Sequence, residues 1–69
     1  MKLSARNVFK GNVKKLVTGM VSTEVTLEIA PDLEITAIIS KASAEGLGLA
    51  EGKSAYALVK ASDVLIAVD

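Results

Sequence analysis

The sequence predicts an all-β barrel of five strands with one short helix, formed by residues 1–69 as a single domain. Three observations favour this fold. Apolar and polar residues alternate along the middle of the chain, turn-forming residues divide it into short segments, and one segment alone has the composition of a helix. Since no linker, internal repeat or low-complexity tract separates the segments, we expect one folding unit.

The first two strands are predicted on either side of one turn. The first covers residues 8–17, with a bend or bulge at Gly11, and Thr18-Gly19 supplies the turn. The second covers residues 20–29 and has the clearest pattern in the chain, because mostly polar residues occupy every other position. A period of two is typical of a strand with one solvated face and one packed face.

A third strand and the helix are predicted next. Ala30-Pro31-Asp32 offers turn chemistry and lacks one backbone donor, so residues 34–39 should return as the hairpin partner of the second strand. Ser40 can cap a helix within residues 40–47, and the glycines that follow end it after one or two turns.

The last two expected strands are apolar on both faces. Residues 50–52 make a turn, and residues 54–60 and 64–68 form strands joined by Ala61-Ser62-Asp63. In a small barrel, a strand with two apolar faces indicates that its outer face meets another subunit. Five strands with a small helix between the third and fourth have the outline of an oligonucleotide/oligosaccharide-binding (OB) barrel.

Size and composition predict that the partner is a second copy of the chain. A chain of 69 residues buries only about 60% of the surface that its unfolded form exposes. Because it has no cysteine, no disulfide can stabilise the fold in place of the missing core. Hydrophobic residues make up 51% of the chain, which is more than one small core can hide. We therefore expect apolar surface to be buried between copies.

Charge and aromatic content argue against two classes of partner. Eight Lys and Arg balance eight Asp and Glu, so the chain has no net positive charge to attract a phosphate backbone. Phe9 and Tyr56 are the two aromatic residues, which is too few for a surface on which bases stack. No apolar run is long enough to cross a membrane, and no signal-peptide core follows Met1. We expect no nucleic-acid partner, no membrane partner and a cytoplasmic location.

The residue types needed for catalysis or metal binding are scarce. The chain has no His and no Cys, so it lacks soft metal ligands and the usual pairing of a nucleophile with a base. Glu24 and Glu28 fall on the polar side of a predicted strand, where a solvated face is the ordinary interpretation. We expect neither an enzyme, nor a bound cofactor, nor direct ligands to a metal cation.

Small hydroxyl residues stand beside cations in three groups at element boundaries: Ser4-Ala5-Arg6-Asn7, Ser40-Lys41-Ala42-Ser43 and Lys60-Ala61-Ser62. A tetrahedral oxyanion needs several donors from different directions, and boundaries supply free backbone N–H groups together with hydroxyls and charged donors. A purely structural interpretation stays open. In it, Ser40 caps the helix, Ser4 belongs to a frayed terminus and Lys60 is a solvated edge charge.

Sequence blocks in a fixed order cover nearly the whole chain. They begin with Ser4-Ala5-Arg6-Asn7 and Lys10-Gly11-Asn12-Val13, and continue over residues 19–25, 38–43, 47–52 and 56–64. Together these blocks resemble the molbindin family, the small Mop-type molybdate-binding proteins. The departures are mild: Val8-Phe9 stands where a polar residue and Leu are usual, and Ala30-Pro31-Asp32 replaces a commonly Gly-rich turn.

The resemblance implies an OB-type barrel that assembles as a homohexamer, a trimer of dimers, and binds molybdate or tungstate at subunit interfaces. The main site that it implies takes Ser4, Ala5 and Arg6 from one subunit and is completed across the interface by Ser40, Ser43, Lys60, Ala61 and Ser62. A second site near the three-fold axis would use Gly19, Met20, Val21 and Ser22.

The function implied by the resemblance is intracellular molybdenum storage and homeostasis. The alternative is a molybdate-sensing or delivery module that acts through a protein partner, because similar modules form the ligand-sensing ends of a molybdate-responsive transcription regulator and of an importer ATPase. Sixty-nine residues leave no room for a DNA-binding or ATPase domain beside this one, so we expect storage as the role.

Overall fold

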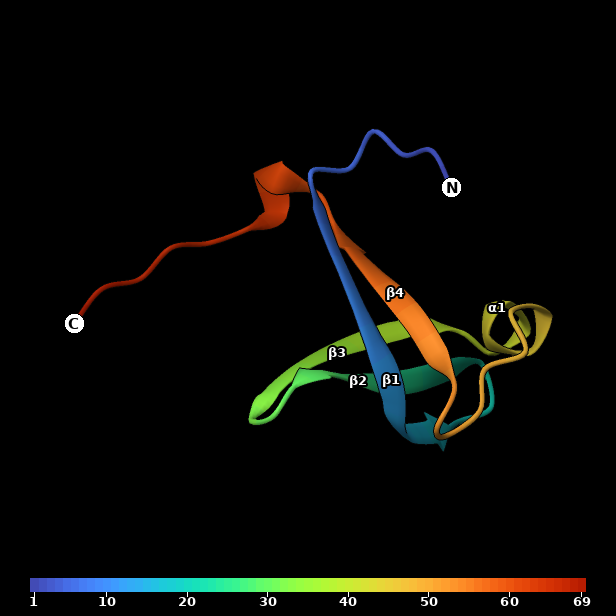
Figure 1. The fold of residues 1–69 in the computed structure, drawn as a ribbon. Coiled ribbons are helices and arrows are strands. Elements are labelled where there is room, and N and C mark those ends of the chain that lie inside the picture. Colours follow the sequence, from blue (N-terminus) through green and yellow to red (C-terminus); the bar gives the residue numbers. More distant parts are fainter.

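The computed structural model describes residues 1–69 as a curled antiparallel sheet with one short helix (Figure 1). The elements in chain order are β1 (Asn7–Thr18), β2 (Ser22–Ala30), β3 (Leu33–Ser40), the helix α1 (Lys41–Gly46), β4 (Ser54–Val59) and the 3-10 turn η1 (Ala61–Asp63). Neither helical element is long and apolar enough to cross a membrane.

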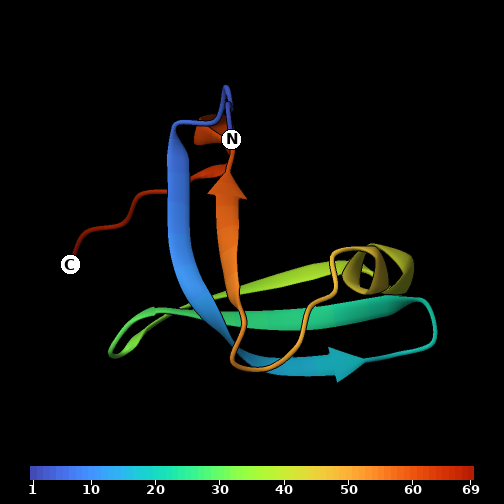
Figure 2. The ribbon, with the colours of Figure 1, turned by 45° about the vertical axis from the view of Figure 1, so that its right-hand side comes forward.

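Strand β1 organises the sheet because it pairs with two different strands along its length. The strand order is β3-β2-β1-β4, and β1 pairs antiparallel with β4 from Asn7 to Asn12 and with β2 from Asn12 to Thr18. Figure 2 shows the result: β1 bends, so that its first half and β4 stand across β2 and β3.

The irregularity expected at Gly11 lies elsewhere in β1. The register with β2 shifts between Val13 and Lys15, which makes Lys14 the bulged residue. Gly11 has a different role, because a Cβ at this position would lie 2.5 Å from the carbonyl oxygen of Glu28. Only glycine permits β1 and β2 to approach so closely where β1 changes partner.

The predicted alternation along β2 is confirmed. Thr23, Val25 and Leu27 are buried, whereas Glu24 and Glu28 are exposed. Val25 and Leu27 form the core together with Val13, and six partly buried hydrophobic residues pack against them: Leu16, Ile29, Ile39, Leu49, Ala55 and Ala57. Only five of 69 residues are buried in the single chain, so most of the apolar surface stays in contact with water.

The helix is also confirmed, with the predicted cap. The hydroxyl of Ser40 accepts a hydrogen bond from the backbone N–H of Ser43 at 3.0 Å, and α1 ends at Gly46. Gly48 follows with a φ of +63°, a conformation that glycine adopts without strain. Residues 20 and 21 differ from the prediction, since they lie in the β1–β2 turn and β2 begins at Ser22.

The prediction of a fifth strand is wrong for the single chain, which has four. Residues 64–68 form no strand, and Leu65, Ile66 and Val68 are 93%, 87% and 92% exposed. We call residues 64–69 the tail; it runs away from the sheet after η1 (Figures 1 and 2). An apolar run becomes a strand only beside a free edge, and the direction of η1 carries the tail away from both free edges of this sheet.

Candidate functional site

Six of the predicted site residues lie together at one end of the molecule. Asn7 is paired with Val59, and its side-chain amide donates to the Val59 carbonyl at 3.1 Å, so the segment before β1 and the segment after β4 are neighbours (Figure 1). We call this group the terminal cluster; its members are Ser4, Ala5, Arg6, Lys60, Ala61 and Ser62.

The terminal cluster offers donors and positive charge to solvent. All its members are exposed except Ala5, which is half-buried. Neither Arg6 nor Lys60 has a carboxylate within 4 Å, since the ion pairs of the chain join Lys14 to Glu28 and Glu34. The first N–H groups of a helical turn have no acceptor within that turn, and in η1 these groups belong to Ala61 and Ser62, which directly follow Lys60 in the chain. This end of the chain can therefore present cations, hydroxyls and amides to one anion.

The other predicted site residues form a second group, at the junction of β2, β3 and α1. The sheet register pairs Ser22 with Ser40, and the N–H of Lys41 donates to the Val21 carbonyl at 3.0 Å. The hydroxyls of Ser40 and Ser43 are 2.8 Å apart and share a hydrogen bond. We call this group the turn cluster; its members are Gly19, Met20, Val21, Ser22, Ser40 and Ser43.

A shallow cavity of about 440 Å³ adjoins the turn cluster. Met20, Val21 and Ser40 line it together with Lys41, Ala42 and Glu45 of α1. Met20 is 95% exposed and Val21 is 82% exposed. An exposed apolar pair at a turn favours contact with another molecule.

The structure thus divides the predicted main site between two ends of one chain. Ser40 and Ser43 accompany the residues predicted for the second site and lie far from Ser4, Arg6 and Lys60. Strand β1 has 12 residues and connects the two ends, so at about 3.3 Å per residue its path is about 40 Å long. The terminal cluster and the turn cluster can share one anion only if they come from different copies.

An ion-pair group that the sequence reading missed lies at the β1 bulge. Lys14 forms a hydrogen-bonded ion pair with Glu34 and a second pair with Glu28 at 3.8 Å. The hydrogen bond and the charge of Glu34 raise the pKa of Lys14. The two carboxylates neutralise the charge of Lys14, so this lysine is not free to bind an anion. Its ion pairs instead connect β1 to Glu28 of β2 and to Glu34 of β3.

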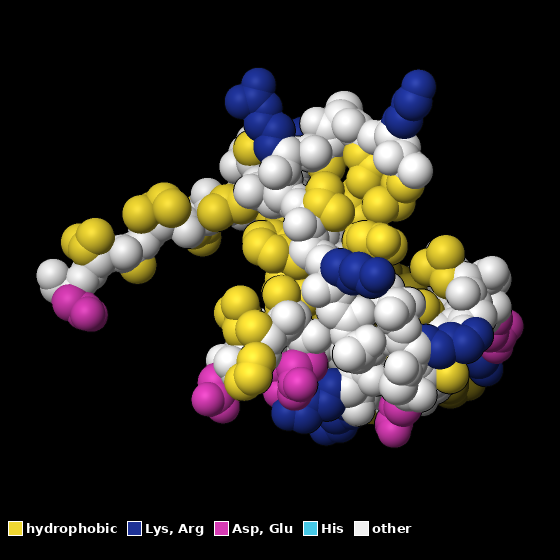
Figure 3. All heavy atoms as spheres, in the orientation of Figure 1, with side chains coloured by type: hydrophobic (Ala, Val, Ile, Leu, Met, Phe, Trp, Pro, Cys, Tyr) yellow, Lys and Arg dark blue, Asp and Glu magenta, His cyan; other side chains and the backbone are white.

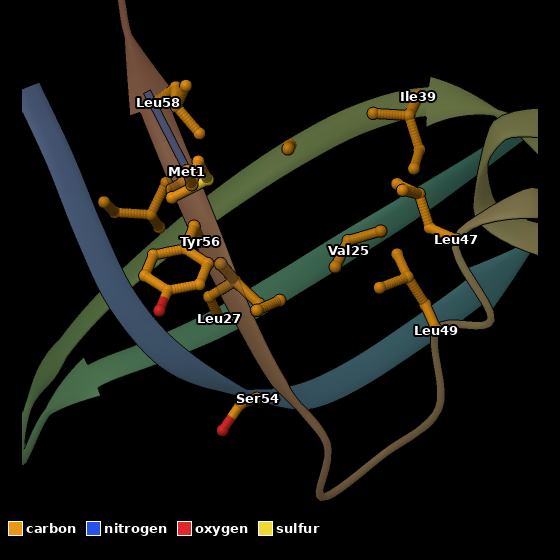
Figure 4. A pocket seen from close by; sticks show the side chains of 13 residues that line it. Met1, Val25, Leu27, Ile39, Leu47, Leu49, Ser54, Tyr56 and Leu58 are labelled. Carbon is orange, nitrogen blue, oxygen red and sulfur yellow. The ribbon is translucent and has the colours of Figure 1, made fainter. Parts of the chain in front are cut away.

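An apolar groove also escaped the sequence reading. It opens between β3 and β4, has a volume of about 430 Å³, and has 12 hydrophobic residues among the 13 that line it (Figure 4). The excess of hydrophobic residues in the composition was its only sign. No lining side chain is charged, so the groove does not suit an oxyanion. No three His, Cys, Asp or Glu side chains are grouped so that they could hold a metal ion.

Comparison with known proteins decides the family. The model of the TOBE domain matches residues 3–66. The chain belongs to the TOBE-domain family. Both clusters of this TOBE domain fall inside the matched residues, and the match ends within the tail.

The relatives of this TOBE domain include small proteins of the Mop type, which confirms the resemblance. The chain is 52% identical to molybdenum-pterin-binding protein 2 of Clostridium pasteurianum over 66 residues, which cover 96% of the chain and 97% of that protein. It is 49% identical over 69 residues to the molybdenum transport protein ModE of Azotobacter vinelandii, and there the chain spans only 26% of the relative's length.

Solved structures confirm the OB-like fold of the TOBE domain. MopII from Clostridium pasteurianum superposes with a TM-score of 0.91 at 49% identity, over 97% of this chain and all of that one. The cytoplasmic molybdate-binding protein ModG, in a form with molybdate bound, gives a TM-score of 0.89 at 46% identity, over 94% of this chain and 46% of that one. The mostly β fold with one short helix is shared with both.

Proposed function

We propose that the chain binds molybdate, and tungstate in the same way, at sites shared between copies of itself. The observation that carries the proposal is the terminal cluster, where Arg6 and Lys60, two cations without carboxylate partners, share an exposed end with the hydroxyls of Ser4 and Ser62. Molybdate as the ligand is supported by the relatives, since the similar ModG structure holds molybdate and the clostridial proteins are named for molybdenum-pterin binding.

The chemistry of binding is replacement of a hydration shell. A dianion that leaves water needs directed donors around all its oxygens and positive charge to offset its own. The Arg6 guanidinium and the Lys60 ammonium supply charge-assisted hydrogen bonds, and the N–H groups of Ala61 and Ser62 supply neutral ones. No bond of the ligand is made or broken, so the site is a binding site and not a catalytic one.

The full site, in this proposal, is formed by two chains. An exposed single cluster leaves one side of the anion in water, whereas Ser40 and Ser43 of a neighbouring copy would enclose it. The homohexamer, a trimer of dimers, is the assembly that we propose. Its support is the small number of buried residues and the exposed apolar turn at Met20 and Val21, which would form a second site with Gly19 and Ser22 near the three-fold axis.

The biological role that we propose is reversible molybdenum storage and homeostasis in the cytoplasm, without a nucleic-acid or membrane partner. One observation favours a second candidate, a sensing or delivery module: the Azotobacter relative contains this domain within a much longer molybdenum transport protein. The candidates differ in their partners. The immobilised chain can be incubated with cell extract in the presence and absence of molybdate. A specific protein that is retained only with molybdate would favour sensing or delivery, whereas storage predicts that no such protein is retained.

Isothermal titration of the ligand-free chain tests the binding proposal. We expect tight binding of molybdate and tungstate and weak binding of sulfate, because a cavity shaped for the two larger anions holds the smaller one with longer hydrogen bonds. Lys60→Ala should weaken molybdate binding by roughly 2–5 kcal/mol, the cost of removing one partner of a desolvated charge pair.

Lys15→Ala is the matched control for this titration. Lys15 is an exposed lysine of β1 that belongs to neither cluster, so its removal should leave the affinity unchanged. Equal affinity for sulfate, or equal effects of the two substitutions, would refute the proposed site.

A further inference from the structure

The proposed second site, at residues 19–22, has no charged side chain of its own. The Ser22 hydroxyl is the one side-chain donor among its four members. The turn itself uses one of their backbone donors, because the Gly19 N–H is bonded to the Ser22 carbonyl at 2.8 Å. A dianion that leaves water requires positive charge as well as neutral donors. The second site therefore needs a cation from outside the turn.

The basic side chains of the chain differ in what they contact. Three lysines already have a partner: Lys14 is paired with two glutamates, the Lys53 ammonium donates to a backbone carbonyl at 3.1 Å, and Lys10 lies over an aromatic ring. The two cations of the terminal cluster lie at the other end of the chain. Lys41 of α1 has no carboxylate within 4 Å and donates no side-chain hydrogen bond. Its ammonium is therefore available to an anion.

The backbone of Lys41 is fixed to the turn that forms the second site. Its N–H donates to the Val21 carbonyl at 3.0 Å, and the preceding residue, Ser40, pairs with Ser22 in the register of β2 and β3. The Lys41 side chain lines the shallow cavity of about 440 Å³ together with Met20 and Val21. Because a lysine stem is long and flexible, the ammonium can follow an anion held at the turn while the backbone stays in place.

A carboxylate stands on the same side of α1. Glu45 follows Lys41 by four residues and lines the same cavity, yet the two charged groups do not form an ion pair. Figure 3 shows basic and acidic side chains beside each other on the surface over α1. An anion at the turn would be attracted by Lys41 and repelled by Glu45, so the two side chains act on its affinity in opposite directions.

We propose that the Lys41 ammonium is the cation of the second site, and that Glu45 lowers the affinity of this site for oxyanions. The inference rests on the proposed function, because it presupposes an oxyanion at residues 19–22. Each kind of site then has its own source of charge: the main site takes it from Arg6 and Lys60, and the second site takes it from Lys41. Substitutions at position 41 should therefore change the second site more than the main one.

Equilibrium dialysis against molybdate at low ionic strength tests this assignment in a chain that carries Lys60→Ala. Because Lys60→Ala weakens the main site, the molybdate that this chain still retains reports the second site. Adding Lys41→Met should weaken the remaining binding by at least about tenfold, since it removes the cation that offsets the charge of the anion. Adding Lys41→Arg should preserve the binding, because arginine restores the charge.

Glu45→Gln should act in the opposite direction. It removes the negative charge beside the anion and keeps the size of the side chain. Molybdate should therefore bind about two- to fivefold more tightly, which is the range for an interaction between exposed charges. Lys15→Met is the matched control for the charge change. Lys15 is an exposed lysine of β1 outside both clusters, so its substitution should leave the retained molybdate unchanged.

The possible results separate the assignment of Lys41 from the proposed function. The assignment is overturned if the native chain binds molybdate but the Lys60→Ala chain retains none, or retains it equally with and without Lys41. A Lys41→Arg variant as weak as Lys41→Met would also overturn it, because the effect would then not depend on charge. Absence of molybdate from the native chain would refute the proposed function itself, and the assignment with it.

Discussion

Gly11→Ala is the substitution whose effect the structure predicts most directly. The new Cβ would stand 2.5 Å from the Glu28 carbonyl oxygen and 2.8 Å from the Ile29 side chain, whereas ordinary contact begins at 3.4 Å. The obstacle is backbone, so β1 and β2 must separate by several tenths of an ångström where the sheet turns. Overpacking of this kind costs about 1–3 kcal/mol, and loss of a ladder hydrogen bond adds about 1 kcal/mol.

Urea unfolding at a fixed protein concentration measures this cost. We expect the free energy of unfolding to fall by about 2–4 kcal/mol with little change in the slope against denaturant. Gly46→Ala is the matched control, because no atom lies within 4 Å of its new Cβ and the residue is helical. It should be neutral or stabilise by up to about 1 kcal/mol. Equal stability of the Gly11 variant and the native chain would refute the close approach of β1 and β2.

Three further perturbations have defined outcomes. Saturation with molybdate at about 100 times Kd should stabilise the ligand-free assembly by about 2.7 kcal/mol and raise its melting temperature; an unchanged melting curve would contradict binding to the folded state. Leu27→Ala should destabilise the chain by about 2–5 kcal/mol in denaturant titrations, because Leu27 is only 5% exposed, and a loss below 1 kcal/mol would mean that the core is not formed around it. The raised pKa of Lys14 means that its pair with Glu34 contributes fully to the stability of the fold below the ordinary lysine pKa of 10.5, and that this contribution is lost as the pH rises through the raised pKa. Above pH 10.5 the stability of Lys14→Met should therefore fall less steeply with pH than that of the native chain. Parallel plots of stability against pH for the two proteins would exclude an ion pair in the folded state.

Local features of the fold could be predicted from the sequence. The alternation along β2, the turn at Pro31 and Asp32 and the Ser40 cap all depend on neighbouring residues, and the structure contains each of them. The bulge at Lys14 could not be predicted, because it depends on the register between β1 and β2.

The tail shows why local pattern is not enough. Residues 64–68 have the composition of a buried strand, but a strand also requires a partner edge, and composition does not say which molecule supplies it. The same applies to the predicted site. Arg6 and Lys60 are brought together by the long-range pairing of β1 with β4, whereas Ser40 lies with the β1–β2 turn because of the β2–β3 register. Which residues share a site is therefore decided by topology, and the sharing of one anion between copies stays a prediction.

Anomalous diffraction at the molybdenum absorption edge, from crystals grown with molybdate, tests the central claim most directly. The account predicts ordered molybdenum between copies, held by Arg6 and Lys60 from the terminal cluster of one chain and enclosed by Ser40 and Ser43 of a neighbour. Monomers in the crystal, or molybdenum only at scattered lattice contacts away from both clusters, would contradict it.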